Sequence, residues 1–367
     1  MTMGLGQNIN RRRSRIALSA AELAALSGIP LARVVEIEGG TSPSTVELHA
    51  LAGAMEIDPA SLYRGEIETP FTRSSVRFRA PEGVQSLDQA DTKLLARAAE
   101  AGRVAFQLQS LLGLADSPVR ASRAIKSVKP HPEPWKQGYE LGARAREIFD
   151  GSGKGLRSVQ ELFEQNYIHV AQVEFKSSEI EAASLFEAQA TPVILLNARA
   201  ERVRRALPRR AILAHELCHL LHDGGERDVL TIVSREHAGT AQERRANGFA
   251  PSFLAPGDHV VPTSGDPIEQ VLAIARAWGL SFEGAVWHAK NLGRISASEA
   301  DNLIGEASNA IIEAHFEPEL PRTDPHDLGL DVDISPLSVG FLSELALQAY
   351  AADLISGGRA MEILSFG

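Results

Sequence analysis

The sequence predicts a mainly α-helical protein with one small β-sheet, an α+β fold. Apolar residues recur at helical spacing in segments that reach from the N-terminal region to the C-terminal end. Three short runs are instead typical of strands, and they follow one another closely in the chain: Tyr167–Glu174, Ala183–Glu187 and Pro192–Leu196. We therefore expect a central region that contains the sheet, flanked by helical regions on both sides.

Composition sets the broad class of the protein. A chain of 367 residues is long enough for two or three domains, and 44% hydrophobic residues can fill their cores. A net charge of −10 argues against a globally basic nucleic-acid binder. The single cysteine, Cys218, excludes an internal disulfide framework and fits a reducing compartment. Without a signal peptide or an apolar run of roughly 20 residues, a cytoplasmic protein with no membrane contact is expected.

Changes in composition divide the chain into four parts. Residues 7–66 are a small helical module, and residues 67–137 are connecting helices followed by a proline-rich linker. Residues 138–295 form the central domain, and residues 296–367 a helical C-terminal region. We expect the last helices of the chain to be a packing arm or the arm of a homodimer.

One predicted helix carries a motif with metal chemistry. His215 and His219 are four residues apart, so both imidazoles project from one face of the helix. Two such imidazoles can share a Zn²⁺ ion, which accepts nitrogen ligands at roughly 2.0–2.1 Å. Glu216 follows the first histidine, where it can reach a water on the ion. This H-E-x-x-H arrangement is that of a zinc hydrolase with Glu216 as the general base.

A third ligand is needed, because five-residue motifs of this kind also arise by chance. Glu243 and Ala246 lie on one face of a later helix, and Phe249 and Phe253 continue the same apolar stripe. A carboxylate on an inward-facing stripe is costly unless it is paired or bound to a metal. Glu243 is therefore the expected third ligand.

These motifs together resemble the ImmA/IrrE family of metallopeptidases. The resemblance runs from about residue 140 to about residue 292 and rests on the segments Pro192–Asn197, Arg209-Arg210, Ala214–Leu221 and Glu243–Ala250, with Leu254 and Pro256. It implies a zincin-like domain, zinc, and proteolysis of helix-turn-helix repressors. It also implies a thermolysin-like ligand set of His215, His219 and Glu243, with Glu216 as the base.

Two residues depart from the family pattern without removing a ligand. Cys218 stands where the family usually has glycine, one step off the face of His219. Pro251 is expected to interrupt the second helix of the site.

Other polar residues near the motif have open roles. His222 could replace a ligand but is more often a polar cap in such a position, and Asp223 could orient a ligand imidazole. His237 and His259 are candidate donors to the oxyanion of the reaction, and their spacing does not choose between them. The arginine-rich segment Ala200–Arg210 is either a solvated helix face or a substrate-binding surface.

The N-terminal module, residues 7–66, resembles the Xre/Cro-type helix-turn-helix. The matching residues are Leu18-Ser19, Leu23-Ala24, Gly28-Ile29, Ile37-Glu38, Gly40, Pro43-Ser44, Leu48, Leu51-Ala52, Ile57 and Leu62. The resemblance implies five helices and makes DNA an expected partner.

The recognition helix departs from that pattern, because base edges are read by polar and basic side chains. The usual reading positions hold Pro30, Leu31, Ala32, Val35 and Glu36, with Arg33 as the basic exception. DNA contacts are then expected mainly at phosphates, from Arg11, Arg12, Arg13, Arg15 and Arg33. The alternative is a helical docking module that has lost DNA readout.

We interpret the chain as a zinc-dependent endopeptidase that cleaves a helix-turn-helix repressor or an antitoxin-like regulator, in transcriptional, stress or mobile-element control. An alternative is a DNA-binding transcriptional regulator whose metal site senses or stabilises, and a third interpretation is a docking protein of a mobile element. The intact Glu216 favours the enzyme, since a structural metal site needs no base.

Overall fold

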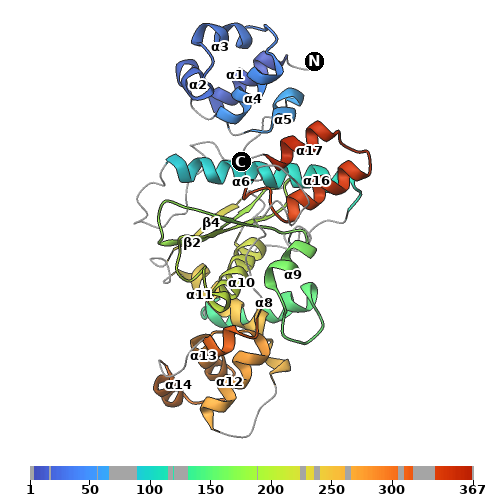
Figure 1. Ribbon diagram of the computed structural model, residues 1–367. Coiled ribbons are helices and arrows are strands. Elements are labelled where there is room, and N and C mark those ends of the chain that lie inside the picture. The colour runs from blue at the N-terminus through green and yellow to red at the C-terminus, as the bar shows by residue number, and fades with distance from the viewer. Residues whose placement is uncertain are drawn as a thin grey trace. The chain divides into compact units, whose positions relative to one another are not determined.

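The structure is a computed structural model (Figure 1). It describes residues 4–15, 18–55, 57–65, 89–114, 119, 131–187, 189–223, 229–234, 240–260, 266–304, 310–316 and 335–365. The chain divides into two compact units, Met1–Val104 and Ala105–Gly367. Most described residues lie in helices and a small mixed sheet lies in the second unit, so the expected α+β fold is confirmed. No helix among the described residues is long and apolar enough to cross a membrane.

The first unit begins with the five helices that the sequence predicts, within the described residues up to 65. They are α1 (Leu5–Arg15), α2 (Ala20–Ser27), α3 (Leu31–Glu38), α4 (Thr45–Ala54) and α5 (Pro59–Arg64). Ser19 and Ser44 cap α2 and α4, each in a reciprocal capping box with the glutamate three residues later. Gly28 ends α2 with a φ of 71°, a left-handed conformation that glycine adopts without a steric penalty. A small apolar core joins the helices, with Leu23, Ile37 and Leu51 fully buried.

The second unit is built around a four-stranded sheet within the described residues. Its strands are β1 (His169–Val173), β2 (Ile180–Phe186), β3 (Val193–Asn197) and β4 (Val229–Ser234), in the order β1-β3-β2-β4. β1 and β3 are parallel, whereas β2 runs antiparallel to both of its neighbours. The three predicted strands correspond to β1, β2 and β3.

Strand β4 is absent from our sequence-based expectations. Its sequence, Val-Leu-Thr-Ile-Val-Ser, is rich in β-branched residues and therefore carries a strand signal. It lies between the two helices of the predicted metal site. In the structure it pairs with β2 and occupies one edge of the sheet.

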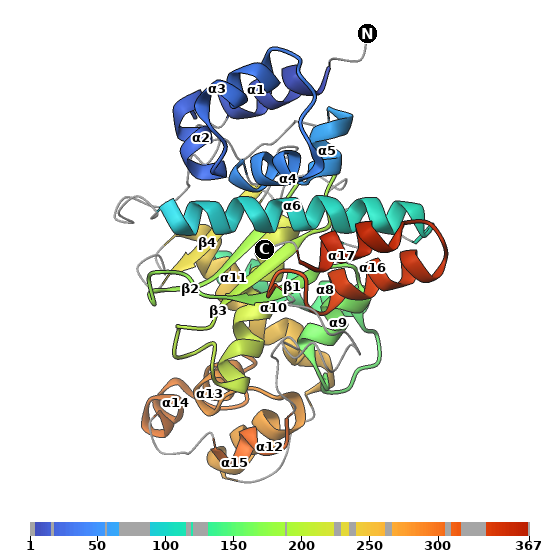
Figure 2. The ribbon, with the colours of Figure 1, turned by 45° about the horizontal axis from the view of Figure 1, so that its top comes forward.

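Four helices lie on the same side of the sheet in both views (Figures 1 and 2). They are α8 (Pro134–Phe149), α9 (Val159–Gln165), α10 (Ala206–His222) and α11 (Ala241–Leu254). Helix α8 begins at Pro134, inside the predicted proline-rich linker. Proline is tolerated in the first turn of a helix, where its missing N–H has no partner to lose, so our interpretation of Pro134 as a linker residue was wrong.

The structure describes eight further helical elements, of which α6 crosses the boundary between the two units. They are α6 (Gln89–Leu111), the 3-10 helix η2 (Gly257–His259), α12 (Pro267–Trp278), α13 (Phe282–Asn291), α14 (Ala297–Leu303), α15 (Ala310–Glu313), α16 (Phe341–Ala351) and α17 (Gly357–Leu364). The C-terminal helices form a hairpin beside β1, shown in red in Figures 1 and 2. Imidazole Nε2 of His169 in β1 lies 2.8 Å from the carbonyl oxygen of Leu337 and donates to it.

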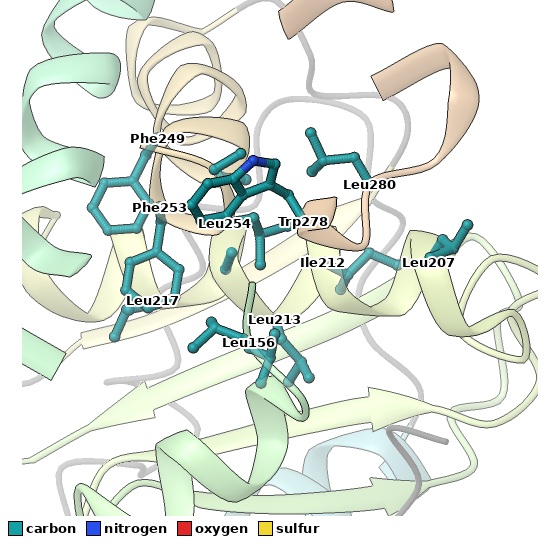
Figure 3. Close-up of a cluster of buried hydrophobic side chains, with 14 of the residues drawn as sticks. Leu156, Leu207, Ile212, Leu213, Leu217, Phe249, Phe253, Leu254, Trp278 and Leu280 are labelled. Carbon is teal, nitrogen blue, oxygen red and sulfur yellow. The ribbon is translucent and has the colours of Figure 1, made fainter. Parts of the chain in front are cut away.

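The core of the second unit lies between α10, α11 and the segment after α12 (Figure 3). Phe249 and Phe253 of α11 stack with ring centroids 5.8 Å apart. Leu213 and Leu217 of α10 are fully buried in the same cluster, and Trp278 is 6% exposed. Burial of such side chains stabilises the fold by roughly 1.5–3 kcal/mol each. This core therefore fixes α10 against α11.

Helices α8 and α11 touch along their backbones. Gly138 and Gly142 of α8 leave no room for a Cβ, because a methyl group there would overlap the carbonyl oxygens of Arg245 and Phe249, respectively. Gly248 of α11 likewise lies against the backbone of α8. Small residues one turn apart allow two helices to approach this closely. The approach holds α11 at a fixed distance from α8.

Candidate metal centre

Helix α10 places His215, Glu216 and His219 in the buried interior of the second unit. These side chains belong to a helix that is buried from Leu207 to Leu221 apart from the partly exposed Ala211. The two imidazole Nε2 atoms, one turn apart, lie 3.0 Å from each other. The helical spacing thus brings the two histidines together as the sequence predicts.

The neighbouring helix α11 supplies Glu243 in its first turn. Thr240 caps this helix, its hydroxyl accepting a hydrogen bond from the Glu243 N–H at 3.2 Å. The two carboxylate oxygens of Glu243 lie 3.1 Å from Nε2 of His215 and 3.4 Å from Nε2 of His219. Burial raises the pKa of Glu243, but hydrogen bonds and charge interactions with the two histidines outweigh burial and lower it well below its ordinary value. The carboxylate is therefore ionised, as a metal ligand must be.

The three donors fit a tetrahedral metal site. One ligand atom from each of His215, His219 and Glu243 lies within 4.8 Å of the others, so this group of described residues could hold a metal ion. Ligands at 2.0–2.1 Å from a tetrahedral zinc ion are roughly 3.3–3.4 Å apart. The two Nε2 atoms are 3.0 Å apart, Oε2 of Glu243 lies 3.1 Å from that of His215, and Oε1 of Glu243 lies 3.4 Å from that of His219, so each of these pairs is close to that spacing. Imidazole nitrogens with a carboxylate oxygen are also the donor types of catalytic zinc sites.

Glu216 is the buried carboxylate beside this group. Its side chain belongs to a fully buried residue, and it is not a member of the three-donor cluster. Burial raises the pKa of Glu216, against the opposing effects of His219 and His215 and of the Ser184 hydroxyl on β2. A carboxylate with a raised pKa next to a metal site has the character of a general base or acid.

Asp223 caps the C-terminal end of α10 and contacts a ligand. The Nδ1 N–H of His219 donates a hydrogen bond to the Asp223 carboxylate. This contact leaves the lone pair of Nε2 facing the donor group. The structure thus confirms the orienting contact that the sequence suggested for Asp223.

Of the other candidate residues, those that the structure describes are not members of the group formed by His215, His219 and Glu243. His222 packs edge-on against Phe249, with ring centroids 5.9 Å apart. Cys218 is fully buried, and burial raises the pKa of its thiol to about 12. His259 is exposed in η2, whereas His237 lies outside the described residues. Helix α11 continues through Pro251 to Leu254, so the expected interruption at Pro251 is wrong.

Two buried arginines of the segment 200–210 donate hydrogen bonds to backbone carbonyl oxygens. Arg210 is fully buried and donates to the carbonyl oxygens of Leu156 at 2.8 Å and Gly279 at 3.1 Å. Arg209 is 2% exposed and donates to the carbonyl oxygen of Val203 at 2.6 Å. For these two residues, both expected roles, a solvated face and a substrate-binding surface, are wrong. Arg210 instead ties the start of α10 to two loops.

The arginines proposed for DNA contacts lie in the first unit. Arg12 is 1% exposed, and its Nε and Nη2 donate to the carbonyl oxygen of Met55 at 3.1 and 2.8 Å. Arg13 forms an ion pair with Glu38 at 2.5 Å and donates to the carbonyl oxygen of Leu18 at 2.8 Å. Both guanidinium groups thus hold α1 to the rest of the module. This geometry does not favour a phosphate contact by Arg12.

Arg33 on α3 is also engaged within its own unit. Its guanidinium pairs with Glu47 at 2.7 Å and with Glu36 at 3.2 Å. Arg11 is partly buried, and the side chain of Arg15 lies outside the described residues. DNA binding by these residues stays a prediction.

Comparison with known proteins adds to this geometry. Residues 166–286 match the family model Peptidase_M78, described as the IrrE N-terminal-like domain. The matched segment contains His215, His219, Glu243 and Glu216. Residues 166–286 are therefore similar to the IrrE N-terminal domain. No curated protein and no solved structure matches the chain.

The three predicted metal ligands, His215, His219 and Glu243, lie within the segment that matches the IrrE-like domain. The family resemblance predicted from the sequence is confirmed for this segment, and it supports a metallopeptidase-type function. The matched residues begin just before β1 and end within α13, so they include the whole sheet and both helices of the site. The predicted fusion to a helix-turn-helix module stays a prediction.

We predict one Zn²⁺ ion per chain, held by His215, His219 and Glu243. A double variant, His215→Ala with His219→Ala, should lose the metal because one carboxylate remains from the three donors. Elemental analysis of purified protein measures the zinc content. His131→Ala, which changes an exposed histidine, is the control and should keep the full content. Undiminished zinc in the double variant would contradict the assignment.

Proposed function

We propose that this protein is a zinc-dependent endopeptidase that cleaves a helix-turn-helix repressor or an antitoxin-like regulator. The observation that carries the proposal is a fully buried Glu216 next to two histidines and a carboxylate in an IrrE-like domain. A metal site that only stabilises the fold has no need of such a base.

A zinc ion held by His215, His219 and Glu243 would supply Lewis-acid chemistry at the scissile carbonyl. Glu216 accepts the proton of the attacking water and later returns it to the leaving amine. Asp223 keeps His219 in the tautomer that leaves Nε2 available. The buried surroundings strengthen these electrostatic interactions, because water is largely excluded.

The edge strand β4 supports an extended peptide substrate. It pairs with β2 on one side and ends the order of the described strands on the other. An edge strand can add a peptide by main-chain hydrogen bonds, which read the extended backbone rather than particular side chains. A flexible segment of a regulator, such as the boundary of its helix-turn-helix domain, has the required conformation.

The test is direct cleavage of candidate regulators. Purified, zinc-loaded protein is incubated with the helix-turn-helix proteins encoded near its gene and with short peptides that span their domain boundaries. Mass spectrometry should show new termini at one site, and a chelator should abolish them. Peptides are included because they need no unfolding before cleavage. Failure to cut any of these substrates, with zinc bound, would favour the alternative of a regulator whose metal site senses or stabilises.

For the N-terminal module we predict weak DNA binding that varies little with sequence. Helix α3 exposes Leu31 and Val35 by 46% and 54%, respectively, and these apolar side chains offer base edges no hydrogen bonds. Binding should then come from phosphates and weaken as salt rises. Fluorescence anisotropy with unrelated duplexes at several salt concentrations measures both properties. Tight binding to one operator, lost on single base changes, would refute the prediction.

A further inference from the structure

The IrrE-like domain contains a buried ion pair that contacts His219, one of the three predicted metal ligands. Arg245 of α11 pairs with Asp223 at the end of α10. The two side chains are 9% and 7% exposed. A buried ion pair costs desolvation energy, and removing one partner leaves an uncompensated buried charge. Arg245 is absent from our sequence-based list of site residues.

Asp223 uses different oxygens for its two contacts. Its Oδ2 accepts the hydrogen bond from Nδ1 of His219, and its Oδ1 faces Nη2 of Arg245. The carboxylate is therefore held from both sides and cannot rotate without losing one contact. A side chain restrained in this way fixes the plane of the His219 ring as well as its tautomer.

Arg245 makes a second polar contact from α11 to α10, beside that of Glu243. Glu243, two residues earlier on α11, contacts His215 and His219, whereas Arg245 contacts Asp223. Two polar contacts from one helix to another fix rotation about the helix axis as well as distance. The carbonyl oxygen of Arg245 is moreover the atom against which Gly138 of α8 packs. The backbone and the side chain of Arg245 are thus both held.

Cys218 of α10 also lies against the guanidinium group of Arg245. It is fully buried and interacts with the Arg245 side chain. A glycine at this position would leave the space of the thiol side chain empty. The cysteine therefore confines Arg245 on the side of α10.

We propose that Arg245 is a positioning residue for the metal, acting through Asp223 on His219. The inference rests on metal binding at the proposed site, and it does not need the peptidase activity. By fixing the ligand imidazole before the ion arrives, the ion pair reduces the ordering that metal binding would otherwise require.

The test measures metal affinity in variants of the full chain. Arg245→Met keeps an unbranched side chain of similar length and removes the charge. Arg245→Lys keeps the charge but loses the planar fork that matches a carboxylate. Arg244→Met is the matched control, because Arg244 is exposed on the same turn of α11. Zn²⁺ and Co²⁺ affinities are measured by competition with a chelator, and the visible spectrum of bound Co²⁺ reports ligand geometry.

We expect Arg245→Met to weaken metal binding by about 10–100-fold, the usual effect of losing a group that supports a metal ligand. The Co²⁺ spectrum should change as well. Arg245→Lys should recover part of the affinity, and Arg244→Met should match the wild type. Unchanged affinity and spectrum in a folded Arg245→Met variant would overturn the proposal.

A second variant tests the proposal independently, in case Arg245→Met does not fold. Asp223→Asn keeps an oxygen that accepts from His219 but removes the charge that holds Arg245. It should weaken binding to a similar extent, and unchanged affinity would overturn the proposal. In a folded double variant with Arg245→Met, little further loss is expected, because both changes break one chain of contacts. Failure of the wild type to bind metal would instead refute the proposed function.

Discussion

Replacing Glu216 by glutamine is expected to abolish detectable cleavage while the protein keeps its metal. Glutamine is nearly isosteric with glutamate but cannot accept a proton as a carboxylate does. Loss of a general base lowers the rate by roughly 10²–10⁴-fold. Glu216 lies outside the donor group, so metal binding should survive. Both quantities are measured in parallel, as the rate of appearance of new peptide termini and as zinc content.

Glu243→Gln is the comparison variant, because it separates loss of a metal ligand from loss of the general base. Glu243 contacts both histidines, and a neutral amide oxygen is a poorer zinc ligand than a carboxylate. This variant should lose metal and activity together, whereas Glu216→Gln should lose activity alone. Cleavage by Glu216→Gln at close to the wild-type rate would show that the proposed peptidase mechanism is wrong.

Replacing Gly138 by alanine is expected to destabilise the second unit despite the higher helix propensity of alanine. In a helix interior, alanine is favoured over glycine by roughly 0.8–1.0 kcal/mol. At Gly138, however, the new methyl group would overlap the carbonyl oxygen of Arg245, which is a backbone atom and cannot rotate away. Overpacking of this kind typically costs about 1–3 kcal/mol, so the steric cost should exceed the propensity gain.

Thermal unfolding and metal affinity together test this expectation. The melting temperature should fall, and metal binding should weaken, because any shift of α11 moves Glu243 and Arg245. Gly53→Ala is the control, since Gly53 lies in helix α4 and a methyl group there meets no atom within 4 Å. That variant should be at least as stable as the wild type. Equal stability of Gly138→Ala and Gly53→Ala would mean that the contact between α8 and α11 relaxes easily.

The sequence predicts the local part of the metal centre well, because helical spacing alone places the two histidines. The proximity of His215 and His219 follows from the period of one helix. Glu243 is predicted as a ligand because it is a charged residue on an otherwise apolar helix face. Asp223 follows from its place one turn after His219. The contact between Asp223 and Arg245 joins two helices, and no spacing within either helix reveals it. The one hint in the sequence was that Arg245, a charged residue, directly precedes Ala246 on the predicted apolar face of the helix.

Other differences have equally local causes. Arg12 follows Ile9 by three residues and therefore shares its inward face, so helical periodicity could have predicted its burial. Strand β4 has the composition of a strand but is not among the three predicted strands. Pro251 was expected to interrupt α11, but the helix continues through it to Leu254.

The donors of the metal centre come from two helices that are separated along the chain. His215 and His219 end one helix, and Glu243 begins the next. An ion held by both helices is a cross-link that closes the intervening segment, and the unfolded chain has no such preformed site. Binding then stabilises the folded chain by about 1.4 kcal/mol for each tenfold rise in free metal above the dissociation constant. For a protein of the proposed function, metal supply would set the stability of the folded domain as well as its activity.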